Sequence, residues 1–133
     1  MSDEKNLMRL IKEMSPVLNE GEYVFVTMKD PAILNRDITI CEFKEKEGVT
    51  VVLKREKADE LNLSYQLVVS WITLMVNSSL KAVGLTSAFS GALAENNISC
   101  NVIAGYYHDH IFVDKKDAEN AIIVLNQLSK NSV

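Results

Sequence analysis

Apolar residues recur along the chain with two spacings, and each spacing predicts one kind of element. Steps of three and four residues, as in residues 85–93, indicate a helix with one buried face. Dense runs of β-branched and aromatic residues, as in residues 23–28, indicate buried strands. The predicted elements are a helix over 5–14, a strand over 23–28, a hairpin of 38–43 and 49–53, a short helix over 55–61, a strand over 68–76, a helix ending near 96, a hairpin of 98–104 and 111–113, and a last helix after Asp114.

The order of these elements repeats loosely along the chain. Each half gives a strand, a connection, two strands and a helix, although the two halves share little sequence. Helices with a single apolar stripe pack economically on one face of an antiparallel sheet. We therefore predict an α+β fold, a duplicated ferredoxin-like sandwich with halves at 1–66 and 67–133. Because a half of this length buries little surface, we expect the halves to share a core.

Charge and cysteine content exclude several classes of function. The formal net charge of -4 and a pI near 5.2 create no field for phosphate backbones, so we expect no nucleic-acid partner. Cys41 and Cys100 stand alone, which suits reduced thiols. The start is charged and amphipathic, and the longest apolar run, residues 67–76, is broken by Ser70 and Thr73. We expect a cytoplasmic protein with no membrane partner.

The second half resembles a known family. Residues 78–86, the helix after them and the strand over 98–104 resemble the ACT domain, most closely the regulatory ACT repeats of aspartokinases. The phrase Leu93-Ala94-Glu95-Asn96-Asn97-Ile98 carries much of this resemblance. Continued through residues 106–113, the run is similar to short, mostly uncharacterised bacterial proteins with two ACT-like halves. The first half is similar only in element order and in the phrase over 41–48.

The resemblance implies a regulatory protein without catalysis that binds a free amino acid or another small effector. ACT domains also serve as assembly modules alone, so a dimerisation module without an effector is the alternative. Members of the families that this chain resembles commonly pair, and open sheets pair through edge strands, so a homo-oligomer is expected. The related repeats usually carry asparagine where this chain has Ser99. Asn101, two residues on, points to the same side of a strand.

The candidate ligand-binding residues lie where a strand gives way to a helix. Val83, Gly84, Leu85 and Thr86 form that step, and the free N–H groups of a helix N-terminus favour a carboxylate. Gly84 would let a ligand approach closely, although it could equally be a turn glycine with positive φ.

Ser99 and Asn101 are the other two candidates, on the polar side of the next strand. The alternative is that this side only faces water.

Other residues suggest chemistry but form no complete site. His108 and His110 are two potential metal ligands where zinc needs three or four, so we expect a hairpin tip with exposed or weakly bonded histidines. Ser78 and Ser79 lack the motif of an exposed nucleophile and suit a loop. Trp71 is expected in the core. We predict no catalytic residue, metal site or cofactor, and the acidic balance argues against an RNA-binding sheet.

Overall fold

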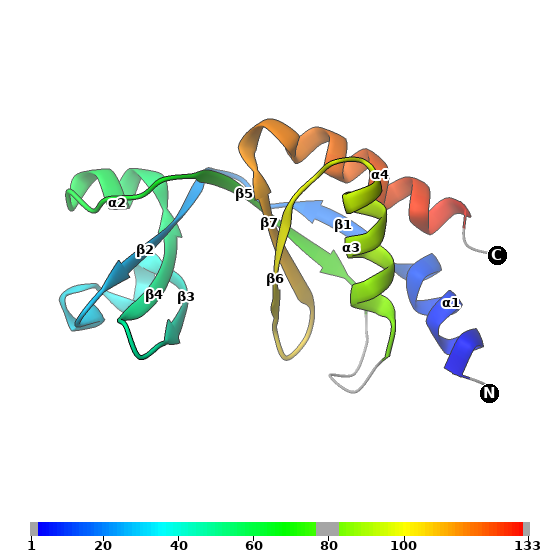
Figure 1. The fold of residues 1–133 in the computed structure, drawn as a ribbon, viewed down its shortest axis with the longest axis horizontal. Helices are drawn as coiled ribbons and strands as arrows, with labels where there is room; N and C mark the ends of the chain where they lie inside the picture. Colours follow the sequence, from blue (N-terminus) through cyan, green and yellow to red (C-terminus); the bar gives the residue numbers. More distant parts are fainter. Residues whose placement is uncertain (1–2, 77–82, 132–133) are drawn as a thin grey trace. The chain divides into compact units, whose positions relative to one another are not determined.

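The computed structural model describes residues 3–76 and 83–131, and its contacts divide the chain into two compact units. The inserted unit comprises residues 20–69, and the terminal unit comprises residues 1–19 together with 70–133. Each unit has its own strands and helices (Figure 1), and a separate hydrophobic cluster lies in each. In sequence, the inserted unit interrupts the terminal unit.

The inserted unit is an antiparallel sheet with one short helix. Its elements are β2 (Tyr23–Met28), the 3₁₀ turns η1 (Pro31–Ile33) and η2 (Arg36–Ile38), β3 (Thr39–Lys44), β4 (Val49–Lys54), α2 (Arg55–Glu60) and the start of β5 (Val68–Met75). The strand order is β3-β4-β2-β5, and the first residues of β5 pair with β2, Val68 opposite Val24 and Val69 opposite Tyr23. The two 3₁₀ turns occupy the connection between β2 and β3, where the repeat would place a helix.

Alternation along β2 and β4 determines which side chains face the core of the inserted unit. Val24 and Val26 lie beside Leu53 and Val51 of the neighbouring strand, and all four join one core with Ala58 of α2. Strand side chains alternate between faces, so the residues between these valines point to the other side of the sheet. The predicted hairpin and the short helix after it are confirmed.

The terminal unit combines both ends of the chain. Its elements are α1 (Asp3–Glu13), β1 (Ser15–Leu18), the remainder of β5, α3 (Leu85–Glu95), β6 (Cys100–Ala104), β7 (Asp109–Asp114), the 3₁₀ turn η3 (Lys115–Asp117) and α4 (Ala118–Asn131). The strand order is β1-β5-β7-β6. Ile11, Phe89 and Leu125, one from each α-helix, are buried in one core with Ile72 and Ile111 of the sheet, so the helices cover the face to which these residues point.

The predicted fold class, α+β with two ferredoxin-like halves, is confirmed, and so are the main helices and strands. One strand was not predicted: Ser15-Pro16 ends the first helix as expected, but it also begins β1. β1 pairs antiparallel with β5, on the side of β5 away from β7. In the inserted unit β5 itself holds the equivalent place beside β2. The loop predicted at residues 77–79 lies outside the described residues.

Candidate functional site

The candidate loop at the start of α3 has the backbone of a helix cap. Gly84 is the N-cap residue, with φ 96° and ψ −16°, and its carbonyl accepts the first helical hydrogen bond from Ala88 N at 2.9 Å. Leu85 is buried in the core, whereas the Val83 side chain is 83% exposed and Thr86 is exposed. Glycine has no side chain with which to cap the first N–H groups of the helix, so an outside acceptor can do so.

The backbone conformation at Gly84 and a close neighbouring side chain both require a glycine at this position. A positive φ of this size strains any residue with a Cβ. A Cβ built at Gly84 would lie only 2.8 Å from Leu7 Cδ2 of α1. The start of α3 is therefore in contact with the N-terminal helix, an arrangement that no local sequence pattern indicates.

The other two candidates, Ser99 and Asn101, lie past the far end of α3. The eleven residues of α3 rise about 16 Å along the helix axis, so Gly84 and Ser99 follow from opposite ends of this helix. On β6, Asn101 lies opposite Phe112 of β7, and Cys100, its neighbour, packs into the core under the helices. Asn101 is exposed and points to the helix-free face of the sheet. A single copy thus does not bring Asn101 to the loop at Gly84.

A hydrogen-bonded group that sequence reasoning missed occupies this helix-free face. Trp71 Nε1 donates to His110 Nδ1 at 3.0 Å, and Thr73 Oγ1 lies 3.1 Å from the same nitrogen. Asn19 Nδ2 donates to Thr73 Oγ1 at 2.9 Å and to the Trp71 carbonyl oxygen at 3.2 Å. The expectation that Trp71 lies in the core is therefore wrong, because this residue is only half-buried. The expectation of a weakly bonded histidine is wrong for His110, which accepts the indole hydrogen bond.

The indole hydrogen bond determines the protonation of His110. An indole N–H can only donate, so Nδ1 accepts and the neutral ring carries its proton on Nε2. Burial, and then the neighbouring His108, lower the pKa of His110 below its usual 6.5, while Asp109 opposes them. The ring is accordingly held in its neutral form near neutral pH.

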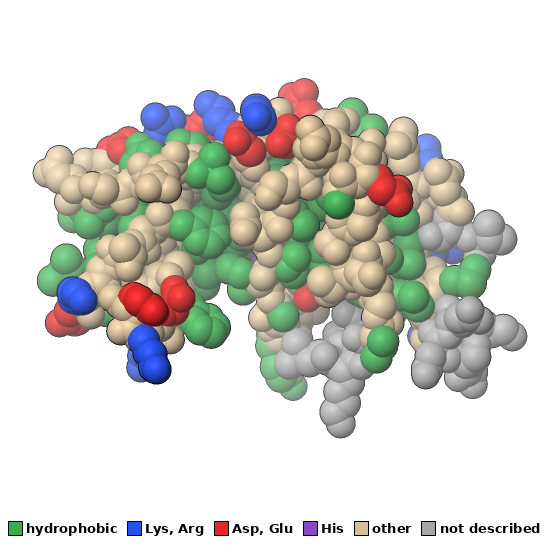
Figure 2. Space-filling model, in the orientation of Figure 1, with side chains coloured by type: hydrophobic (Ala, Val, Ile, Leu, Met, Phe, Trp, Pro, Cys, Tyr) green, Lys and Arg blue, Asp and Glu red, His purple; other side chains and the backbone are tan. Residues whose placement is uncertain are grey.

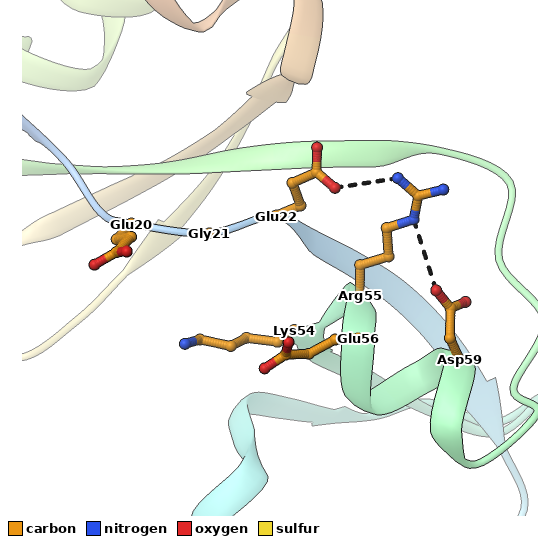
Figure 3. A pocket seen from close by; sticks show the side chains of 7 residues that line it. All are labelled: Glu20, Gly21, Glu22, Lys54, Arg55, Glu56 and Asp59. Carbon is orange, nitrogen blue, oxygen red and sulfur yellow. Dashed lines mark hydrogen bonds and ion pairs between the residues drawn. The ribbon is translucent and has the colours of Figure 1, made fainter.

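A separate pocket of about 570 Å³ lies in the inserted unit, between the turn before β2 and the start of α2 (Figure 3). Its lining residues are Glu20, Gly21, Glu22, Lys54, Arg55, Glu56 and Asp59. The guanidinium of Arg55 is held from three sides. Its Nη1 donates to Glu22 Oε1 at 3.1 Å, its Nε donates to Tyr65 Oη at 3.0 Å, and Asp59 Oδ2 lies 3.8 Å from Nε.

This arrangement makes Arg55 a structural residue rather than a free ligand group. The hydrogen bonds that Arg55 donates to Tyr65 and Glu22 raise its pKa above the usual value, so it stays charged. Figure 3 shows Lys54, Glu20 and Glu56 pointing away from this cluster. The pocket is open and none of the predicted site residues lines it. Its geometry alone shows no ligand.

The cysteines and the potential metal ligands of the described part form no disulfide and no metal site. Cys41 and Cys100 are free, and burial raises the pKa of each thiol, which keeps both protonated. Within residues 3–76 and 83–131, no group of three or more His, Cys, Asp or Glu side chains is placed to hold a metal ion. Figure 2 shows acidic and basic side chains interspersed on the face in view.

The helices of the described residues are all too short or too polar to cross a bilayer.

Comparisons with known proteins agree on one family. Two ACT domain family models match the chain, one over residues 2–70 and the other over residues 67–127. A solved Vibrio cholerae protein of unknown function, described as a possible transport protein, is 46% identical, with a TM-score of 0.86 over 96% of this chain and 99% of that one. No curated protein matches the chain.

More distant solved structures share the fold. An Agrobacterium tumefaciens protein is 13% identical, with a TM-score of 0.70 over 87% of this chain and 89% of its own. The regulatory subunit of aspartate kinase from Thermus thermophilus is 9% identical, with a TM-score of 0.59 over 85% of this chain and 95% of its own.

Proposed function

The chain belongs to the ACT domain family, with one family match in each half, and from this premise we propose that it is a regulatory protein that senses a free amino acid. It acts without catalysis, in the cytoplasm, and by changing its assembly or a contact with another protein. The resemblance to aspartokinase regulatory repeats supports a regulatory role.

The start of α3 is the proposed binding position for the ligand carboxylate. The observation that carries this choice is the left-handed backbone of Gly84, the N-cap residue. Gly84 leaves the first N–H groups of α3 without a side-chain cap. Those groups and the helix dipole favour an anion there. The exposed Val83 and Thr86 flank this position.

Ser99 and Asn101 complete the proposed site only from a second copy. Within one chain they follow the far end of α3, and Asn101 points to the helix-free face of the sheet, away from the helix that begins after Gly84. A homo-oligomer in which one copy presents Asn101 near the α3 loop of its partner would bring the two sets together. The proposal therefore includes a homo-oligomer with the effector between copies.

A thermal-shift screen against the twenty amino acids tests the proposal. A ligand bound only by the native state at a hundredfold excess over Kd adds about 2.7 kcal/mol, which raises the melting temperature by about 10 °C for a chain of this size. Substitutions at Gly84 are unsuitable, because they strain the backbone and collide with Leu7. The exposed Thr86 in the first turn of α3 offers a cleaner variant.

Thr86→Glu places a negative charge where the ligand carboxylate would lie, while an acidic residue in a first turn favours the helix itself. We expect this variant to melt at or above the wild-type temperature without ligand and to lose the amino-acid shift. Thr86→Gln, the uncharged control of equal size, should keep most of it. An undiminished shift in Thr86→Glu would place the ligand elsewhere.

The assembly module without an effector is the second candidate, and the contact of Leu7 with Gly84 favours it, because a methyl group already fills space beside the loop. If none of the twenty amino acids at millimolar concentration moves the wild-type melt, this candidate replaces the first.

A further inference from the structure

The two chain segments that join the inserted unit to the terminal unit are hydrogen-bonded to each other where they leave the terminal unit. Asn19 is the last residue of the terminal unit before the inserted unit, and Ser70 is the first residue after it. Asn19 N donates to the Trp71 carbonyl oxygen at 2.9 Å, and Asn19 Nδ2 donates to the same oxygen at 3.2 Å. These bonds continue the pairing of β1 with β5. We call Asn19, Ser70 and Trp71 the junction.

Side chains connect the junction to β7. The Trp71 indole donates to His110 Nδ1, and Thr73 Oγ1 lies 3.1 Å from that nitrogen. The same Thr73 oxygen accepts from Asn19 Nδ2 at 2.9 Å. The Trp71 ring lies 5.7 Å from the His110 ring, centroid to centroid, and stacks on Phe112 at 6.3 Å. Thr73 is only 8% exposed, so water competes little for its hydroxyl group.

Protonation of His110 changes which of these bonds can exist. In the neutral ring Nδ1 has one lone pair, which accepts the indole N–H. In the charged ring Nδ1 also carries a hydrogen, so two N–H donors 3.0 Å apart face each other. Thr73 Oγ1 can accept the new Nδ1–H, because a hydroxyl oxygen has two lone pairs and the bond from Asn19 uses one.

The His110 ring has little room to answer protonation by moving away. Its Nε2 lies beside Gly105 in the hairpin turn, where a Cβ would be only 3.1 Å from Nε2 and 2.9 Å from the His108 carbonyl oxygen. The backbone of the turn therefore confines the ring on its Nε2 side. An exchange of hydrogen-bond partners at Nδ1 is the smaller change.

The ionisable groups that act on His110 within the terminal unit belong to its own hairpin. Burial lowers the pKa of His110 most, His108 lowers it further, and Asp109 raises it. The strands β1, β5 and β6 contain no Asp, Glu, Lys, Arg or His, and Cys100 of β6 packs under the helices on the other face. The tyrosines at 106–107 in the turn are exposed to solvent. None of these three strands thus supplies a carboxylate to stabilise the charged ring.

We propose that acidification switches His110 from accepting the Trp71 hydrogen bond to donating one to Thr73, and that this exchange loosens the junction. In the neutral state the indole bond fixes Trp71, whose carbonyl oxygen holds Asn19. In the charged state Trp71 loses its bond to His110, and its carbonyl oxygen is held less firmly against Asn19. Acidity is then a second input to the protein, independent of any effector at the α3 loop.

NMR of the full-length protein follows both ends of this exchange. Trp71 is the single tryptophan, so one indole N–H signal reports its hydrogen bond, while the ring ¹⁵N shifts of His110 report its protonation. Both should change with one midpoint below the usual 6.5. Across that midpoint the Asn19 amide should lose about two- to tenfold of its protection against hydrogen exchange, corrected for intrinsic rates. An indole signal or an Asn19 protection that stays constant overturns the proposal.

Substitutions at Thr73 distinguish the exchange from a general loosening around the ring. Thr73→Val removes the acceptor of the charged ring at similar shape, so the proton affinity of His110 should fall by about two- to tenfold. Thr73→Ser retains the hydroxyl group and should keep the wild-type midpoint. Loosening alone would hydrate the ring and raise the midpoint, because burial lowers it. An unchanged or raised midpoint in Thr73→Val therefore refutes the exchange.

His110→Asn tests whether His110 is the group that senses acidity. An asparagine amide oxygen can accept the indole N–H but does not titrate. In this variant the indole signal and the Asn19 protection should not change between pH 7.5 and 5, conditions chosen to bracket the usual histidine pKa of about 6.5. His108→Gln, the control, should retain the transition at a higher midpoint, because His108 lowers the pKa of His110. A transition that persists in His110→Asn, or disappears in His108→Gln, would assign the response to another group and overturn the proposal.

Discussion

The contact between Leu7 and Gly84 can be measured as a coupling energy. Gly84→Ala would hold a Cβ in the left-handed region at φ 96°, which costs an L-residue about 1–2 kcal/mol. It would also press that Cβ to 2.8 Å from Leu7 Cδ2, a contact that the flexible leucine relieves at a cost of about 1 kcal/mol. We expect a total loss of about 2–3 kcal/mol in the free energy of unfolding, or about 8–12 °C in melting temperature.

A double-mutant cycle separates the two causes. In a Leu7→Ala background Gly84→Ala should cost only the backbone strain, about 1–2 kcal/mol, which leaves a coupling of about 1 kcal/mol. Urea unfolding monitored by the fluorescence of Trp71, the single tryptophan, reports on the terminal unit that contains both residues.

Gly91 provides the control for this cycle. It lies within α3, and nothing stands within 4 Å of a Cβ built there, so Gly91→Ala should stabilise by about 0.5–1 kcal/mol. An unchanged cost of Gly84→Ala in the Leu7→Ala background would refute the contact, and a stabilising Gly84→Ala would refute the cap geometry as well.

Three further predictions concern the terminal unit. Asn97 directly follows the C-cap residue of α3 and has φ 61°, so Asn97→Ala should cost about 1 kcal/mol in thermal unfolding, whereas Asn97→Gly should be neutral or stabilising. Phe89 is fully buried, so Phe89→Ala should cost about 3–5 kcal/mol in urea, against less than about 1 kcal/mol for Ile123→Ala at an exposed position of α4. The unfolded chain binds a proton at His110 more readily than the folded one, so urea titrations should show stability falling as the pH drops below about 6.5, and less steeply in His110→Gln.

Much of the fold is determined by local pattern. The strand over 23–28 and the hairpin after it are dense in β-branched residues between clear turn signals, and they lie within a residue of their predicted bounds. Asp114, expected to begin the last helix, caps the 3₁₀ turn η3 directly before α4, and its carboxylate accepts from Lys116 N at 3.0 Å. These features depend on residues that are close in sequence.

The site was harder to predict because its geometry depends on residues far apart in sequence. A glycine before a helix gives no indication that Leu7, far along the chain, touches it. The same holds for the bond from Trp71 to His110, which joins two strands through their register. A tryptophan in an apolar run suits a core in isolation, and only the pairing of β5 with β7 shows that its indole N–H meets an imidazole.

The strand β1 was not predicted because it is short and its residues have a weak tendency to form a strand. Its four residues begin with Ser15-Pro16, a pair that indicates a helix stop, and proline cannot donate in a sheet. The structure tolerates Pro16 because β1 is an edge strand, paired only with β5 among the described residues.

The edge strand β1 nonetheless completes the sheet of the terminal unit. The first two residues of β5 belong to the inserted unit, where they pair with β2. The later residues of β5 belong to the terminal unit. A terminal unit built only from β5 and the residues C-terminal to it would have α4 as its last element and no strand on the free side of β5. The N-terminal segment supplies that strand, and α1 before it packs Ile11 into the same core. The two ACT halves are thus consecutive in sequence, whereas the terminal unit is complete only when both ends of the chain are present.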